Sequence, residues 1–237
     1  MSISRPGKSG TDGSRHNFYH VIHKGLRLGH GRQLSAIGST DFGDDTAMAA
    51  TLATLRAFLV LARGHLEGEN REIHTALEAR MPGASAHAAD DHEDHETSFA
   101  EIETLIRAIE TAPAATRQTA ADALYRRYAL FAAHDFEHMN AEETALLASL
   151  HEAFTDAELI DIERRIVAAI PQQKMAAYLA IMLPAINHGE RVALLSEMKA
   201  GMPPDVFEAA LHGAVKPALD DRSFSAAVAA LGLKRAA

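Results

Sequence analysis

An all-α fold is predicted by three features of the sequence. Alanine, leucine and glutamate are abundant, and these residues favour helices. The apolar and polar alternation of β-strands is absent, whereas apolar residues recur at helical spacing. Four long helical segments are joined by short connections, which predicts an up-down-up-down four-helix bundle followed by a C-terminal helical extension.

The four bundle helices are delimited by capping and helix-breaking residues. Asp44 follows a Gly/Ser/Asp-rich turn and is a helix N-cap candidate, whereas Pro82-Gly83 and Pro113 end helices. Three glycines weaken the pattern in the second half of the first helix. The expected helices span about residues 14–37, 45–80, 86–111 and 115–154.

The two ends of the chain differ from this central region. Residues 1–13 are rich in Ser and Gly without an apolar run, so they are expected to form a disordered tail. Residues 155–237 contain shorter helical segments, two of which open with the capping-box patterns Thr155–Glu158 and Asn187–Glu190. We expect these segments to pack on the bundle of residues 14–154 rather than to form a separate domain.

Composition excludes several classes of function. The 237 residues include 23 Lys+Arg and 32 Asp+Glu, a formal net charge of −9, which argues against nucleic-acid and membrane-surface binding. The longest apolar run, residues 57–62, is too short to span a bilayer, and the expected location is cytoplasmic. The chain has 14 histidines and no cysteine, so any metal must be held by nitrogen and oxygen.

Histidines and carboxylates recur at helical spacing on all four expected bundle helices. The first helix has His20 and His23, and the second has His65 four residues before Glu69. The third and fourth helices carry the remaining members of the pattern, His92, His95, Glu96, His134, His138 and Glu142. Side chains one helical turn apart lie on one face, about 6 Å from each other, so both can approach the same ion.

This pattern favours a metal centre over solvated ion pairs. A single His-x-x-x-Glu is most often a surface pair, but here each helix contributes in order. Apolar runs at residues 58–62 and 128–133 lead directly into His65 and His134, so the polar positions continue core-facing stripes. Imidazole and carboxylate ligands favour Fe, Mn or Zn over Mg or Ca, and two-metal bundle sites favour redox-active iron.

The order of motifs resembles the hemerythrin-like (HHE cation-binding) domain family. The resemblance covers about residues 14–154, in the stretches HKGLR at His23, HLEGE at His65, HEDHE at His92 and HMNAEE at His138. It implies two Fe ions bridged by Glu69, Glu142 and an oxo or hydroxo group. His23 and His65 would then bind one iron, and His92 and His138 the other.

The sequence departs from the oxygen-carrying members of this family in its third and fourth helices. The carriers use a fifth histidine where this chain has Glu96, which leaves either Glu96 or the displaced His95 as a ligand. Their fourth-helix carboxylate is an Asp five residues after the histidine, rather than a Glu four residues after it. These departures favour O2 or peroxide activation, or iron sensing, over reversible O2 carriage.

The other histidines are expected either near the metal centre or on the surface. His20 is an alternative to His23 on the first helix, His134 is a candidate proton donor or orienting residue, and His188 of the extension is a further candidate neighbour. The histidines without a partner at ligand spacing are expected on the surface: His16, His30, His74, His87, His151 and His212.

Three functions follow as hypotheses. The first is a di-iron protein that binds O2, NO or peroxide, or iron itself, for sensing, storage or iron handling. The second is a di-iron oxidase, oxygenase or peroxide-consuming oxidoreductase with an open iron position. The third is a helical bundle whose histidines are incidental. The absence of a readable substrate pocket in the sequence favours the first.

Overall fold

A computed structural model describes residues 15–233, and within this range it is all-α, without strands. The all-α part of the predicted fold class is therefore confirmed, while the tail predicted at residues 1–13 lies outside the described residues. The first half of the chain contains α1 (Tyr19–Ser39), α2 (Asp45–Gly68), η1 (Glu69–His74), α3 (Thr75–Arg80), α4 (Ala86–Thr111), α5 (Ala114–Ala141), η2 (Glu142–Leu146) and α6 (Leu147–Ala153). The second half contains α7 (Asp156–Ala169), α8 (Gln172–Ala185), α9 (His188–Gly201), α10 (Pro204–Ala210), η3 (Leu211–Val215), α11 (Lys216–Ala218) and α12 (Asp221–Ala230).

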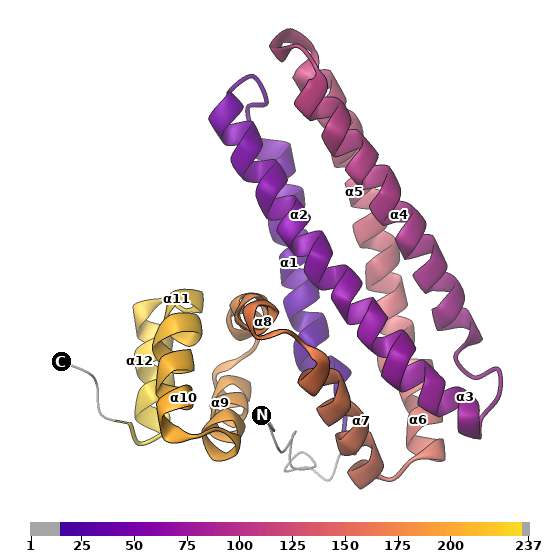
Figure 1. The fold of residues 1–237 in the computed structure, drawn as a ribbon, viewed down its shortest axis with the longest axis vertical. Coiled ribbons are helices and arrows are strands. Elements are labelled where there is room, and N and C mark those ends of the chain that lie inside the picture. Colours follow the sequence, from indigo (N-terminus) through magenta and orange to yellow (C-terminus); the bar gives the residue numbers. More distant parts are fainter. Residues whose placement is uncertain (1–14, 234–237) are drawn as a thin grey trace.

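Four long helical stretches dominate the structure (Figure 1). They are α1, α2–η1–α3, α4 and α5–η2–α6, in which η1 and η2 are π-helical segments between α-helical parts. Contacts join α1 to α2, α2 to α4, α4 to α5 and α5 to α1, so the four stretches form a closed ring. The bounds of α2–η1–α3 and of α4 agree with the predicted 45–80 and 86–111. At the start of α2, Asp44 caps the helix by accepting hydrogen bonds from the backbone amides of Thr46 and Ala47.

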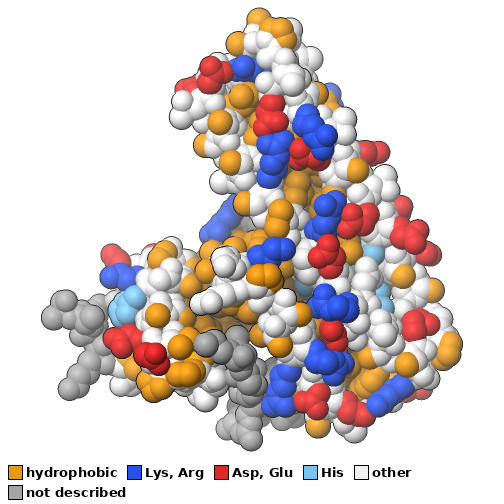
Figure 2. Space-filling model, viewed as in Figure 1, with side chains coloured by type: hydrophobic (Ala, Val, Ile, Leu, Met, Phe, Trp, Pro, Cys, Tyr) orange, Lys and Arg blue, Asp and Glu red, His pale blue; other side chains and the backbone are white. Residues whose placement is uncertain are grey.

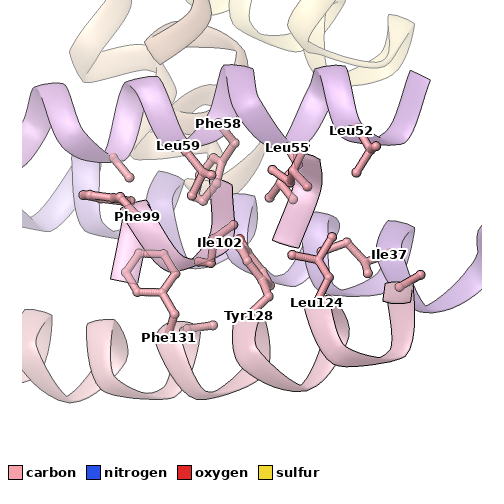
Figure 3. Close-up of a cluster of buried hydrophobic side chains, with 14 of the residues drawn as sticks. Ile37, Leu52, Leu55, Phe58, Leu59, Phe99, Ile102, Leu124, Tyr128 and Phe131 are labelled. Carbon is pink, nitrogen blue, oxygen red and sulfur yellow. The ribbon is translucent and has the colours of Figure 1, made fainter. Parts of the chain in front are cut away.

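Large apolar side chains fill the space between these stretches along one half of their length (Figure 3). On α2, Leu52, Leu55 and Leu59 follow the three- and four-residue spacing of one helix face. They meet Ile102 of α4 and Tyr128 of α5, among other residues. We call this cluster the upper core; it includes Leu26, Phe58, Leu66, Phe99, Phe131 and Met139.

A second apolar cluster, the lower core, lies further along the same stretches. It contains Tyr19, Ile73, Leu77, Ala88, Leu146 and Leu150, and the buried Leu159 of α7 packs into it. Along α2 and η1 the order is Leu66 in the upper core, then Glu69, then Ile73 in the lower core. Along α5 and η2 it is Met139, Glu142 and Leu146, so a polar layer separates the two cores.

The C-terminal helices pack against α1 and α2 through α8. Both predicted capping boxes are present, with Thr155 and Glu158 at the start of α7 and Asn187 and Glu190 at the start of α9. Leu183, Leu195 and Phe207 belong to a third apolar cluster, within the C-terminal helices. Figure 2 shows hydrophobic side chains gathered where these helices meet the long ones.

Within the described residues 15–233, one helical stretch, Asp45–Arg80, is long and apolar enough by length and composition to cross a membrane. Helices α7 and α8 pass the same test only as a pair bent by 117°. The Asp45–Arg80 stretch also supplies much of the upper core and carries buried Glu69. A core helix of a soluble protein has the same composition, so the finding is compatible with a soluble protein.

The glycines of α1 do not end the helix, and Gly29 allows Phe58 of α2 to approach closely. A Cβ added at Gly29 would lie 2.1 Å from Phe58 Cε2, whereas one at Gly31 would meet no atom of the described residues within 4 Å. We therefore expect Gly29→Ala to lower the free energy of unfolding by about 1–3 kcal/mol through overpacking. Gly31→Ala should raise it by about 0.5–1 kcal/mol, because alanine is the better helix former. Urea unfolding checks both, and a shift of the same sign in the two variants would contradict the packing argument.

The partly buried carboxyl group of Glu197 on α9 predicts a pH dependence of stability. Burial, and then the charge of Glu163, raise the pKa of half-buried Glu197 to about 7, while His16 opposes this. Between the usual glutamate pKa and this value the folded chain binds more protons than the unfolded chain, so stability falls as pH rises through this window. We expect wild type to lose about 1–2 kcal/mol more than Glu197→Gln between pH 5 and pH 8, after allowance for solvent screening. Urea unfolding of both proteins at the two pH values tests this, and identical pH profiles would refute it.

Candidate metal centre

Six side chains from four helical stretches converge in the polar layer between the two cores. Residues His23, His65, Glu69 and Glu142 form one group, the His23 group. Residues Glu69, His92, His138 and Glu142 form a second, the His92 group. Within each group, one potential ligand atom per residue lies within 4.8 Å of all the others, which is close enough for one metal ion.

The two groups share Glu69 and Glu142, and each glutamate faces both sides. Glu69 Oε1 lies 3.0 Å from His65 Nε2, whereas its Oε2 lies 3.6 Å from His92 Nε2. Glu142 Oε2 lies 3.3 Å from His23 Nε2 and 3.5 Å from His138 Nε2. This arrangement suits two carboxylates that bridge a pair of ions.

The four imidazoles form two pairs in which the Nε2 atoms face each other, an arrangement that suits a shared metal ion. His23 Nε2 lies 3.2 Å from His65 Nε2, and His92 Nε2 lies 3.0 Å from His138 Nε2. Each pair directs two ring nitrogens at one another within a buried site. Glu69 Oε1 and both carboxylate oxygens of Glu142 are buried without a hydrogen-bond partner among the described residues. Buried polar atoms of this kind are costly unless a ligand compensates them, so the donor set fits a pair of cations.

The two shared glutamates occupy the first positions of the two π-helical segments. Glu69 opens η1 and Glu142 opens η2, although both regions were expected to continue as regular α-helix. The wider turn of a π-helical segment changes the direction of its side chains, and such segments are frequent at functional sites. No feature of the sequence distinguishes these segments from the surrounding helix.

Residues outside the two groups orient three of the imidazoles. Asn70 Oδ1 accepts a hydrogen bond of 2.8 Å from His92 Nδ1, and Asp91 Oδ2 lies 3.1 Å from His138 Nδ1. Glu143 Oε1 lies 3.0 Å from His23 Nδ1. Such bonds fix the tautomer and leave Nε2 directed at the metal position. Sequence reasoning missed these partners, although each is directly adjacent to a candidate ligand.

Burial and the charges of neighbouring side chains shift the pKa values of the candidate ligands. Burial lowers the pKa of His23, but Glu142, Glu143 and Glu69 outweigh it, so the pKa lies well above the usual value. Burial, opposed by Glu69 and reinforced by His138, lowers the pKa of His92 to about 3. For Glu69, burial is outweighed by His65, His23 and His92, and its pKa is well below the usual range. Metal binding at His23 must therefore displace a proton from its imidazole.

The remaining predicted site residues lie outside both groups. Glu96 is half-exposed and pairs with Arg63 at 3.0 Å. His20 is exposed and lies 2.6 Å from Glu190, and His188 is exposed at the start of α9. His134 is partly exposed and lies 3.6 Å from Asp91, which in turn contacts His138.

His95 is buried beside the His92 group and belongs to a separate polar network. Its ring centroid lies 5.0 Å from that of His138, and its Nε2 has no hydrogen-bond partner among the described residues. Its Nδ1 lies 3.7 Å from Asp135, which accepts a 2.7 Å hydrogen bond from His30. The Tyr128 hydroxyl lies 3.0 Å from His30 Nδ1, so a buried chain of polar groups runs from the site into the upper core.

Three histidines expected on the surface are buried, and these expectations were wrong. His30 belongs to the network beside the site, and His16 pairs with Glu163 at 2.9 Å. His74 stacks on His92 with 4.9 Å between ring centroids. Their burial depends on neighbours distant in the sequence, which spacing within one helix does not reveal. His87 and His212 are exposed as expected, and His151 is half-buried.

No protein-family model, curated protein or solved structure matches the chain. The fold and the site therefore stand on the sequence pattern and the geometry alone. The structure is all-helical over its described residues, and its His/Glu groups are within metal-binding distance. These features are compatible with a hemerythrin-like fold.

Proposed function

We propose that the chain is a hemerythrin-like, non-haem di-iron protein. The ring of four helical stretches would be an up-down-up-down four-helix bundle, and its centre would bind O2 or a related small molecule, NO or peroxide. One observation carries this proposal: two groups of potential ligands share Glu69 and Glu142, whose oxygens face both sides.

Each residue of the centre has a defined task in this proposal. His23 and His65 would hold one ion, His92 and His138 the other, and the two glutamates would bridge them. Bound iron would supply small-molecule binding or redox chemistry. Two imidazoles and shared carboxylates leave coordination positions open on each ion, where a small molecule enters.

The surrounding protein supports this chemistry by holding the ligands and excluding water. Asn70, Asp91 and Glu143 orient the imidazoles, which places Nε2 toward the ions. The upper and lower cores cover the polar layer on both sides. His65, with 15% of its side chain exposed, is the most accessible of the six proposed ligands.

A specific observation also supports the second candidate, a di-iron oxidase, oxygenase or peroxide-consuming enzyme. A pocket of about 260 Å³ between the long helices and the C-terminal helices is lined by both His65 and Glu69. A centre that only binds a diatomic molecule does not require this much space. In an enzyme this pocket would be the substrate site, which the sequence alone did not reveal.

Metal analysis of the purified chain, combined with its electronic spectrum, tests the proposal. We expect two irons per chain and near-ultraviolet oxygen-to-iron charge-transfer bands. An O2 adduct that dissociates under vacuum would identify a binding protein, whereas rapid oxidation with turnover of peroxide or an organic substrate would identify an enzyme. A chain that takes up no metal when supplied with Fe(II) would refute both.

A further inference from the structure

The pocket beside the candidate metal centre has the properties of a binding site for an organic molecule. It lies between α1, α2 and η1 on one side and α7, α8 and α9 on the other. Its walls are mainly apolar, with Ile22, Ile166 and Leu194 among the contributing residues. An apolar cavity of about 150 Å³ holds benzene, so a volume of about 260 Å³ accommodates about ten carbon atoms by proportion.

One cation in this pocket has no counter-ion. The side-chain ammonium group of Lys174 makes no hydrogen bond or ion pair in the part of the chain that the structure describes, whereas the other two Arg/Lys side chains of the wall, Arg71 and Arg164, pair with Glu72 and Asp161. Lys174 follows the start of α8, where the N-cap residue, Pro171, provides no side-chain hydrogen bond. The backbone amides of Lys174 and Met175 both donate to Pro171 O, so the attraction for an anion comes from the Lys174 ammonium group.

The Lys174 ammonium group lies beside the part of α2 that carries the candidate ligand His65. A Cβ added at Gly64 would lie 3.8 Å from Lys174 Nζ, and the next residue of α2 is His65. Tyr19 also lines the pocket, stacks on His23 with 4.9 Å between ring centroids, and carries a buried hydroxyl without a hydrogen-bond partner among the described residues. The Lys174 ammonium group and the Tyr19 hydroxyl therefore lie near the candidate ligands, and Arg164 Nε on α7 is a further buried atom of a wall residue without a hydrogen-bond partner among the described residues.

We propose that this pocket binds an apolar monocarboxylate of about ten carbon atoms, with its carboxylate on Lys174 and its chain among the apolar residues of α1, α7 and α9. The bound molecule lies beside His65 and Glu69, so in the second candidate function, a di-iron enzyme, it is the substrate of the metal centre. This last step rests on the proposed function, whereas binding itself depends only on the pocket.

Calorimetry on the iron-loaded chain tests the proposal with three ten-carbon probes: decanoate, decanol and decylammonium. We expect decanoate to bind with one site per chain and more tightly than the other two. Lys174→Met should weaken decanoate about 10- to 100-fold, because a hydrogen-bonded charge is lost, and should leave decanol unchanged. Lys216→Met is the matched control, since Lys216 is exposed on α11 outside the pocket, and it should bind decanoate like wild type.

A second variant tests the location of the ligand independently of charge. Val167 lines the pocket from α7, and Val167→Trp should fill it and abolish binding of both decanoate and decanol while the melting temperature shows that the chain is folded. Decanoate should also perturb the spectrum of the iron centre in wild type. Tighter binding of decylammonium, or decanoate binding that is insensitive to both Lys174→Met and Val167→Trp, would overturn the proposal.

Metal analysis of the same samples separates failure of this inference from failure of the proposed function. Two irons per chain without decanoate binding would overturn the pocket assignment and leave the metal centre standing. Decanoate binding that depends on Lys174, in a chain that takes up no iron, would support the pocket and overturn only the metal chemistry.

Discussion

Glu142→Ala is expected to reduce the iron content from two ions to at most one per chain. The Glu142 side chain is fully buried, and its Oε2 lies within 3.5 Å of both His23 Nε2 and His138 Nε2, one from each group. Its removal takes a carboxylate from both proposed ions at once. Glu69→Ala should have the same effect, because the oxygens of Glu69 also face both groups. Elemental analysis after iron loading and desalting measures the outcome.

Glu96→Ala and His151→Ala are the controls for this experiment. Glu96 was a candidate ligand in the sequence, but its half-exposed side chain pairs with Arg63. His151 lies near His16 and outside both groups. Both variants should retain two irons per chain. Two irons in Glu142→Ala, or loss of iron in Glu96→Ala, would show that the assigned ligand set is incorrect.

Removal of iron is expected to lower the melting temperature by about 8–16 °C. A ligand present at about 1,000 times its dissociation constant stabilises the folded state by about 4 kcal/mol, and each kcal/mol shifts the melting temperature of a chain of this size by about 2–4 °C. Without metal, three buried carboxylate oxygens of Glu69 and Glu142 lack hydrogen-bond partners among the described residues. Differential scanning calorimetry of the iron-loaded and chelator-treated chain tests this, and equal melting temperatures would contradict it.

The difference in melting temperature between the iron-loaded and the iron-free chain should increase as pH rises. His23 has a raised pKa in the metal-free fold, so its contribution to stability is present below the usual histidine pKa and is lost as pH rises through the raised value. Metal binding displaces the proton of His23 and therefore strengthens over the same range. Melting temperatures of both forms at pH 6 and pH 8 measure this, and a gap that narrows at pH 8 would contradict it.

The sequence predicts the helices and the ligand candidates because both depend on local spacing. The segments 45–80 and 86–111 are bounded by caps and breakers, and the structure reproduces them. The positions of His65 and Glu69, and of His138 and Glu142, follow from one helical turn of separation. Their presence on four successive helical segments was enough to predict that the side chains converge.

The features that the sequence did not reveal depend on contacts between distant segments. The burial of His30 depends on Asp135 and Tyr128, which lie on another helix. The pocket arises where α8 crosses α1 and α2, so it requires the placement of the C-terminal helices. The π-helical segments that begin at Glu69 and Glu142 lie within stretches that the sequence pattern predicts as continuous α-helix.

The polar layer between the two apolar cores has a consequence for motion within the chain. Each long helical stretch crosses from one apolar core to the other through this layer, where three carboxylate oxygens of Glu69 and Glu142 lack hydrogen-bond partners among the described residues. Without iron the two ends can open separately, and backbone amides near Ile73 and Leu146 should exchange with deuterium sooner than those near Leu55 and Ile102. With iron bound, both ends should exchange together, so the metals would join two separately opening units into one.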